Sequence, residues 1–128
     1  MGAALVIRKT IELIAQGEKC AWVTVVRTAG STPREIGTRM LVSMDDTLDT
    51  IGGGQLEYRA IEIARAMMVA TNTANRLKLE RFPLSARVGQ CCGGTVWLAI
   101  EVLTEADRAW LGLSQRALGL GNEFPRER

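Results

Sequence analysis

The sequence contains no histidine among its 128 residues. This absence excludes every mechanism that needs an imidazole, including Ser-His-Asp and Cys-His nucleophile pairs, His-ligated zinc and histidine acid/base catalysis. An excess of charge of one sign is also missing, because 16 Lys and Arg oppose 14 Asp and Glu and leave a formal net charge of +2. So small an excess does not favour binding to nucleic acid or to an anionic membrane. We therefore predict neither partner.

Cysteines are few, and long hydrophobic runs are absent. The three cysteines, of which Cys91 and Cys92 are adjacent, do not form the even, spaced framework of a small secreted protein. The apolar opening at residues 2–7 is interrupted at once by Arg8 and Lys9, so it has the length of neither a signal peptide core nor a membrane span. We expect a soluble, cytoplasmic protein without a membrane partner.

The apolar residues that are present predict three amphipathic helices. With 47% hydrophobic residues, the chain is long enough for one domain with its own core. Helical spacing recurs over residues 4–16, where Gly17 is placed to end the helix, then over 56–70 and over 106–117. The apolar stripes consist of Ala4, Ile7, Ile11 and Ile14; of Leu56, Ala60, Ile63 and Met67, widened by Ala64 and Met68; and of Ala106, Trp110, Leu113 and Ala117.

Two nearly continuous apolar runs, residues 20–26 and 95–103, predict strands buried on both faces at the centre of a sheet. Residues 40–44 alternate before the turn-forming Asp45-Asp46-Thr47 and predict a hairpin, and residues 77–80 predict a half-exposed strand. Hairpin-like connections beside a helical crossover indicate a layered α/β domain with a mixed β-sheet flanked by about three helices. We assign residues 1–118 to this domain and residues 119–128 to a flexible tail.

The residues that carry chemistry fall in three glycine-containing loops, each flanking a predicted strand. These loops are Gly30–Arg34, Gly52–Gly54 and Gly89–Gly94. All three would meet at one edge of the sheet if the two central strands run antiparallel.

The run Gly52–Gly54 precedes a predicted helix. Such a turn exposes unpaired backbone N–H groups and the positive end of the helix dipole, which suits a phosphate. It lacks the lysine of a Walker loop and the spacing of a dinucleotide fingerprint. The alternative is a tight turn that only needs positive φ angles. Glu57 would then cap the helix rather than orient a ligand.

Ser31, Thr32 and Arg34 supply two hydroxyls and one planar guanidinium, a set that suits an oxyanion or a heteroaromatic edge. The alternative is an ordinary turn with a solvated arginine. Arg27 and Arg39 on the flanking strands would either add positive charge or extend along apolar surface.

Cys91 and Cys92 stand in a glycine loop, which favours exposed thiols. Thiolates are soft donors that suit late metals and sulfur transfer. Two cysteines are too few for a closed structural zinc site, and Cys20 at the start of a central strand has the pattern of a core residue. The alternative for the pair is a turn with inert thiols.

The segments GSTPREIGTRM, TIGGGQLEYRAI and GQCCGG, in this order, resemble the xanthine dehydrogenase accessory protein family, also called the XdhC/CoxI family. The resemblance covers roughly Ala21 to Val102 and is to the N-terminal domain of these proteins. It implies a maturation factor that binds molybdenum cofactor as cargo and promotes its sulfuration with a cysteine desulfurase. The cofactor is then passed to an apo molybdenum hydroxylase of the xanthine dehydrogenase type.

By this resemblance, the cysteine of the family's Cys-Gly-Gly motif falls on Cys92, implying a contact with molybdenum or its sulfur. We add two assignments of our own: Gly52–Gly54 for the phosphate, and the Ser31, Thr32 and Arg34 set for the pterin or oxo end. The neighbours that complete the predicted cofactor-binding set are Cys91, Gln90, Gly93 and Gly94. Relatives near xanthine dehydrogenase often have histidine where this chain has Gln55, so the client enzyme stays open.

We therefore expect a non-catalytic cofactor-binding chaperone, since the chain also lacks an evident acid/base pair. One alternative is a small thiol-dependent redox, sulfur-transfer or metal-binding protein that uses Cys91 and Cys92. Another is a structural partner domain that has lost the site. Exposed sheet edges and the family resemblance also suggest a homodimer.

Overall fold

A computed structural model describes residues 2–32, 34–70, 76–84 and 93–117. The predicted tail 119–128 lies outside these residues. No described helix is both long and apolar enough to cross a membrane. The elements, in chain order, are α1 (Gly2–Ala15), β1 (Cys20–Ala29), β2 (Arg39–Val42), β3 (Thr47–Leu48), α2 (Gly54–Ala70), β4 (Leu77–Pro83), β5 (Thr95–Leu103), a 3-10 turn (Glu105–Asp107) and α3 (Arg108–Ala117).

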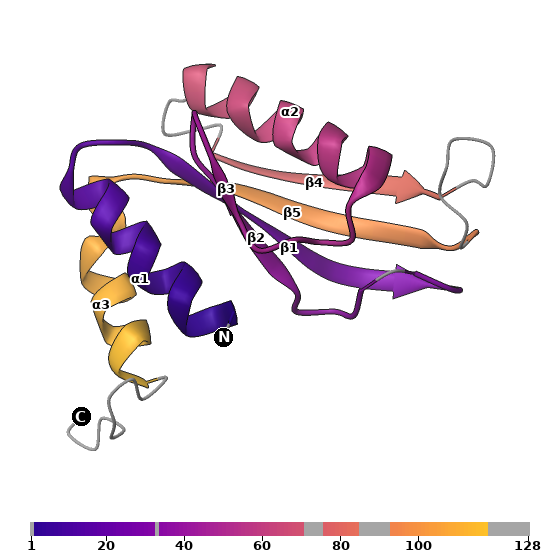
Figure 1. The fold of residues 1–128 in the computed structure, drawn as a ribbon, viewed down its shortest axis with the longest axis horizontal. Coiled ribbons are helices and arrows are strands. Elements are labelled where there is room, and N and C mark those ends of the chain that lie inside the picture. The colour runs from indigo at the N-terminus through magenta and orange to yellow at the C-terminus, as the bar shows by residue number, and fades with distance from the viewer. Residues whose placement is uncertain (1, 33, 71–75, 85–92, 118–128) are drawn as a thin grey trace.

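The five strands form one sheet in the order β3-β2-β1-β5-β4. β1 and β5, the two continuous apolar runs, lie at its centre as predicted. α2 covers one face, and α1 and α3 lie side by side on the other (Figure 1). The layered α/β architecture with three helices is therefore confirmed.

The sheet differs from the prediction in one respect, because its described pairings are all antiparallel rather than mixed. The helical crossover was the reason to expect parallel strands, and α2 does connect two strands that run in the same direction, β3 and β4. These two strands stand at opposite edges of the sheet. Each therefore pairs with an antiparallel neighbour, and the crossover creates no parallel ladder.

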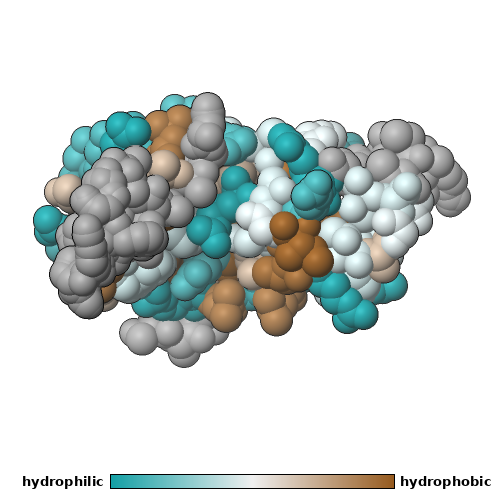
Figure 2. Space-filling view, turned by 90° about the horizontal axis from the view of Figure 1, so that it is seen from below, coloured by the Kyte–Doolittle hydropathy of each residue, from teal (hydrophilic) through white to brown (hydrophobic). Residues whose placement is uncertain are grey.

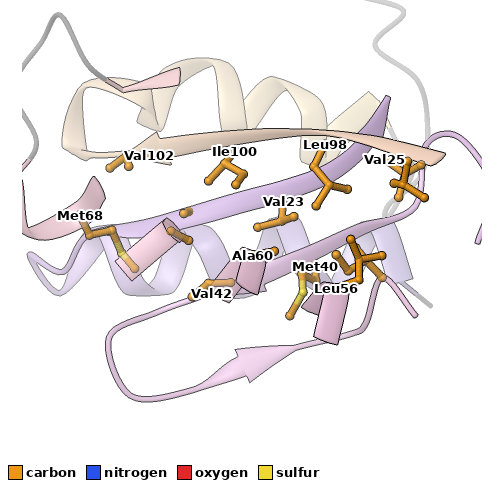
Figure 3. Close-up of a cluster of buried hydrophobic side chains, with 14 of the residues drawn as sticks. Val23, Val25, Met40, Val42, Leu56, Ala60, Met68, Leu98, Ile100 and Val102 are labelled. Carbon is orange, nitrogen blue, oxygen red and sulfur yellow. The ribbon is translucent and has the colours of Figure 1, made fainter. Parts of the chain in front are cut away.

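The core between α2 and the sheet contains the alternate residues of each strand. Val23, Leu98 and Ile100 are buried here against Ala60 and other residues of α2, and their side chains point toward the helix in Figure 3. The buried face of α2 consists of Leu56, Ala60, Ala64 and Met68, while Ile63 and Met67 of the predicted stripe are half-buried at its margin. The two small alanines at the middle of this face let the helix lie close to the strands.

The opposite face of the sheet is buried only where α1 and α3 cover it. α1 buries Val6, Ile7, Leu13 and Ile14 rather than the predicted stripe of Ala4, Ile7, Ile11 and Ile14. The buried face of α1 is rotated about the helix axis relative to the prediction, because Thr10 is buried together with the apolar residues between α1 and the sheet. The Thr10 hydroxyl donates to Val6 O (2.6 Å) and accepts from Trp22 Nε1 (2.9 Å), so a polar residue is buried with its hydrogen bonds made.

α3 likewise presents a narrower buried face than the sequence suggested. Leu111 is fully buried, whereas the predicted stripe residues Trp110 and Leu113 are partly exposed. Asp107 takes the place of an apolar residue here. Its carboxylate accepts hydrogen bonds from Thr104 N (2.9 Å), Trp110 Nε1 (2.8 Å) and Arg76.

Candidate functional site

The three loops lie at the same end of the sheet. β1 and β5 are antiparallel with Ala29 opposite Thr95, so Gly30 directly follows this pair and Gly94 directly precedes it. Figure 1 shows the N-terminus of α2 toward the same end. The predicted convergence is confirmed for the described parts of the loops. Gln90, Cys91 and Cys92 lie outside the described residues.

Gly30 and Gly94 are in direct backbone contact. A Cβ on Gly30 would lie 3.2 Å from Gly94 Cα, and a Cβ on Gly94 would lie 2.2 Å from Ser31 O and 2.6 Å from Ala29 O. No side chain fits at Gly94 without moving the backbone. Close packing between the end of β1 and the start of β5 therefore explains this glycine, and a ligand contact there stays a prediction.

Gly93 and Gly53 are different, because nothing lies within 4 Å of the Cβ position of either. Both have a φ angle of +76°, a region that L side chains rarely adopt. The open space beside them leaves the backbone accessible to a bound molecule.

The turn before α2 contains three consecutive glycines with positive φ angles, 128° at Gly52, 76° at Gly53 and 65° at Gly54. Only glycine adopts such a series without steric cost. The tight-turn interpretation is therefore confirmed, and the backbone conformation accounts for all three glycines.

Glu57 fills the anion position that the sequence assigned to a phosphate. Its Oε1 atom accepts hydrogen bonds from Ile51 N (3.2 Å), from Gly53 N (3.0 Å) and from the Thr50 hydroxyl. Gly52 N donates to Thr50 Oγ1 (3.0 Å). The turn thus binds an anion as expected from its dipole and its N–H groups, and this anion is the chain's own carboxylate.

The Gly30–Arg34 loop presents polar side chains to solvent. Ser31 and Arg34 are exposed and Thr32 is half-buried. The Thr32 hydroxyl donates to Arg34 O (3.2 Å), which closes a small turn. This hydrogen bond links Thr32 to Arg34, a few residues along the chain from the Gly30–Gly94 contact.

Arg27 and Arg39 do not join the loops, because their side chains lie on the face of the sheet opposite α2. The guanidinium of Arg27 stacks 4.4 Å from the centre of the Trp97 ring, and that of Arg39 stacks 4.2 Å from the centre of the Trp22 ring. Burial lowers the pKa of Arg39, an effect that Glu101 opposes. These arginines pack on tryptophans.

Two contacts, one at the glycine turn and one at the opposite end of the sheet, went unnoticed in the sequence. Thr50 anchors the glycine turn through Glu57, and Arg65 of α2 donates from Nε to Ser43 O (2.9 Å), which ties the β2–β3 hairpin to the helix. The seven-residue spacing of Thr50 and Glu57 gives no signal, since the turn between them sets their distance. Among the described residues, no group of three or more acidic or cysteine side chains is placed to hold a metal ion.

The family model described as the XdhC and CoxI family matches residues 13–83. The chain belongs to the XdhC and CoxI family. The match contains the Gly30–Arg34 and Gly52–Gly54 loops and ends before Gly89. No curated protein matches the chain.

A solved structure supports the fold of this family member. The crystal structure of a protein described as a xanthine dehydrogenase from Bacillus halodurans superposes with a TM-score of 0.71 at 20% sequence identity. The similarity covers 88% of this chain and 34% of that chain. This XdhC and CoxI family chain therefore spans about a third of the length of that structure.

Proposed function

We propose that this chain binds molybdenum cofactor as cargo at the loop end of its sheet and assists maturation of a molybdenum hydroxylase of the xanthine dehydrogenase type. The observation that carries the proposal is the backbone contact of Gly30 and Ser31 with Gly94, at the end of the sheet where α2 begins, in a chain of the XdhC and CoxI family. A cysteine desulfurase and the apo hydroxylase are the proposed partners, and the cytoplasm is the proposed compartment.

The chemistry of the cargo fits the donors at this end. The exposed Ser31 and Arg34 offer a hydroxyl and a charged, planar donor to the pterin or an oxo group. Cys92 directly precedes Gly93 in the sequence and follows Gln90 and Cys91. A thiolate at Cys92 would be a suitable soft ligand for the metal or its sulfur. The open space at Gly93 is compatible with the approach of a bulky group.

The structure alters the proposal for the phosphate of the cofactor, because the predicted phosphate site is already occupied by a side chain of this protein. Because Glu57 already accepts from Ile51 N and Gly53 N, a phosphate at Gly52–Gly54 has to displace this carboxylate. Glu57→Gln tests this step. It removes the competing charge, so cofactor affinity rises about tenfold if the phosphate binds there, and stays unchanged if the carboxylate is a permanent cap.

The main experiment is an anaerobic titration of the reduced protein with molybdenum cofactor, followed by ultrafiltration and molybdenum analysis of the retained fraction. Molybdate alone serves as the control for metal without pterin. We expect stoichiometric retention by the wild type, loss in Cys92→Ala and a smaller effect in the neighbouring Cys91→Ala. Thermal unfolding of each variant verifies that the fold is intact.

Arg34→Ala tests the second donor, with Arg59→Ala as the matched control. Both arginines are exposed, and Arg59 lies on α2 in an ion pair with Glu62. We expect a roughly tenfold weaker retention for Arg34→Ala only, since a hydrogen bond to a charged group contributes about 1.5–3 kcal/mol.

Three results count against the proposal. Failure of the wild type to retain the cofactor contradicts binding by this chain. Equal retention by Cys92→Ala contradicts the cysteine assignment. Catalytic thiol exchange by Cys91 and Cys92, with no cofactor retention, favours the thiol-protein alternative.

A further inference from the structure

Among the described strands, β4 stands at one edge of the sheet. In the described part of the chain it pairs only with β5, and five of its seven residues are exposed. An edge strand carries a row of N–H and C=O groups that another strand can pair with. The opposite edge strand, β3, has only two residues, so β4 is the longer edge.

The hydrogen bonds at the two ends of β4 identify which groups face outward. Leu84 N donates to Gly94 O (2.8 Å), and Val102 N donates to Arg76 O (2.8 Å). Bonded and non-bonded residues alternate along an antiparallel ladder. The even-numbered residues of β4 therefore pair with β5, while Leu77, Leu79 and Arg81 direct their N–H and C=O groups outward. Pro83 has no N–H to offer.

The outward-bonding residues also carry an apolar surface. Leu77 and Leu79 are 61% and 67% exposed, and they stand opposite Glu101 and Ala99 on β5. This register places them on the face of the sheet that points away from α2. Figure 2, which views the molecule from this side, shows hydrophobic side chains gathered on the face. Two neighbouring exposed leucines on an open edge indicate a surface that is covered in an assembly.

We propose that β4 pairs antiparallel with β4 of a second copy of this chain, with Leu79 opposite Leu79 at the two-fold axis. In this register Leu79 of each copy exchanges two backbone hydrogen bonds with its counterpart. Leu77 of each copy exchanges two more with Arg81 of the other. Every outward donor of Leu77, Leu79 and Arg81 then has an acceptor, and the two sheets join into one.

The charges on β4 select this register. Lys78 and Glu80 form an ion pair within the strand (3.6 Å), and in the proposed pairing Lys78 also stands opposite Glu80 of the second copy. Centring the pairing on residue 78 or 80 places Lys78 opposite Lys78 or Glu80 opposite Glu80, which is destabilising. Centring it on Arg81 places Leu79 opposite Pro83, which lacks the donor. Among these registers, only the one around Leu79 makes the strand complementary to itself.

The first test measures mass and register. Light scattering with size-exclusion chromatography over about 5–500 µM is expected to show a concentration-dependent shift toward twice the chain mass of 14.0 kDa. Leu79→Cys and Leu77→Cys are then compared in a background with Cys91 and Cys92 replaced by serine. A hydrogen-bonded antiparallel pair separates Cα atoms by about 5.5 Å, within disulfide range. Leu79→Cys therefore forms a disulfide-linked dimer at least tenfold faster than Leu77→Cys, which faces Arg81.

The second test uses charge reversal. Lys78→Glu and Glu80→Lys each weaken dimerisation about tenfold, because each places like charges opposite one another. Mixing the two single variants restores the dimer, since their strands are complementary to each other. The intrachain ion pair is not restored by mixing, so this rescue reports only on pairing between copies.

The proposal is overturned by a wild type that stays monomeric at 500 µM, by equal cross-linking of Leu77→Cys and Leu79→Cys, or by a dimer that both charge reversals leave unchanged. A variant that fails to fold is identified by its circular dichroism. The comparison of Leu77→Cys with Leu79→Cys then decides whether the strands pair as proposed, because both substitutions are at exposed positions.

Discussion

At the scale of single residues, we expect replacement by alanine to change the stability of the fold in opposite directions at Gly94 and at Gly112. A Cβ at Gly94 would lie 2.2 Å from a backbone oxygen, whereas at Gly112 in α3 nothing lies within 4 Å. Gly94→Ala should lower the free energy of unfolding by about 2–3 kcal/mol through overpacking. Gly112→Ala should raise it by about 0.5–1 kcal/mol through helix propensity. Urea unfolding measures both, and a neutral Gly94→Ala would contradict the packing.

Cys20 provides a second residue-scale prediction. It is fully buried, and burial, with smaller contributions from Asp107 and Glu18, raises the pKa of its thiol to about 12. A buried thiol without thiolate character is unreactive. In a protein with Cys91 and Cys92 replaced by serine, we expect no labelling by a thiol reagent at pH 8 until denaturant is added. Stoichiometric labelling of the folded protein would show that β1 opens readily.

The sequence predicted which residues are apolar core better than it predicted polar contacts. Cys20 was assigned to the core because its strand is continuously apolar, and burial follows from that local pattern. The stacking of Arg27 on Trp97 depends on a register shift in β1 between Val25 and Arg27. No local pattern specifies such an irregularity, so the side that each arginine faces had to come from the structure.

At the scale of elements, the start of α2 depends on Glu57. Its carboxylate accepts from two backbone N–H groups and from Thr50. Glu57→Ala should cost about 1–2 kcal/mol, the usual range for removing a helix cap. Glu62→Ala on the same helix is the control, because its ion pair with Arg59 is exposed and contributes less than about 0.5 kcal/mol. Thermal unfolding compares the two, and equal losses would contradict the capping role.

Asp107 joins the start of α3 to the residue before β4. Burial opposes its charged form, but hydrogen bonds from Thr104 N, the Trp110 indole and Arg76, together with the charge of Arg76, hold its pKa below the ordinary value of 3.8. A lowered pKa stabilises the fold above the unfolded value, and this contribution is lost as the pH falls through the folded pKa.

Asp107→Asn should therefore cost about 2 kcal/mol near pH 7, where a charge-assisted hydrogen bond network is removed. The difference from the wild type should shrink below about pH 4, as the wild-type carboxylate becomes protonated. Urea titrations at several pH values measure this. Glu105→Gln, whose ion pair with Arg108 is exposed, should show almost no difference at pH 7, and a deficit of Asp107→Asn that is independent of pH would contradict the electrostatic account.

The 3.6-residue repeat of apolar residues indicated the helices, and the nearly continuous apolar runs indicated both central strands, because both patterns are local in the sequence. Strand pairing was less predictable. We expected a mixed sheet, but the sheet is antiparallel, because α2 connects strands at its two opposite edges, β3 and β4, which do not pair with each other. The antiparallel pairing of β1 and β5, in contrast, is enough to bring the end of β1 and the start of β5 together, while the place of Gly52–Gly54 depends on the pairings of β2 and β3 as well. Topology therefore brought the described parts of the loops to one end of the sheet, whereas the hydrogen bonds of Glu57 to the glycine turn could be known only from the structure.

At the scale of the whole molecule, the two faces of the sheet are covered unequally. α2 covers one face along its length, and α1 and α3 cover only part of the other (Figure 1). The proposed cofactor end and the β4 edge are both on the less covered part of the fold. None of Gly30, Gly94, Leu77 and Leu79 belongs to either buried cluster. Binding at the loops and pairing at β4 can therefore be altered without disrupting the main cores.

Hydrogen exchange tests this organisation across the sheet. In a dilute sample, the amides of Lys78, Glu80 and Phe82 bond to β5 and should exchange slowly, while those of Leu77, Leu79 and Arg81 should exchange fast. Central residues of β1 should be the slowest, since only opening of the whole sheet exposes them. At high protein concentration the three fast amides should slow together if a second copy pairs with the edge. Slow exchange at these amides even at the lowest concentration would mean that the chain itself covers β4.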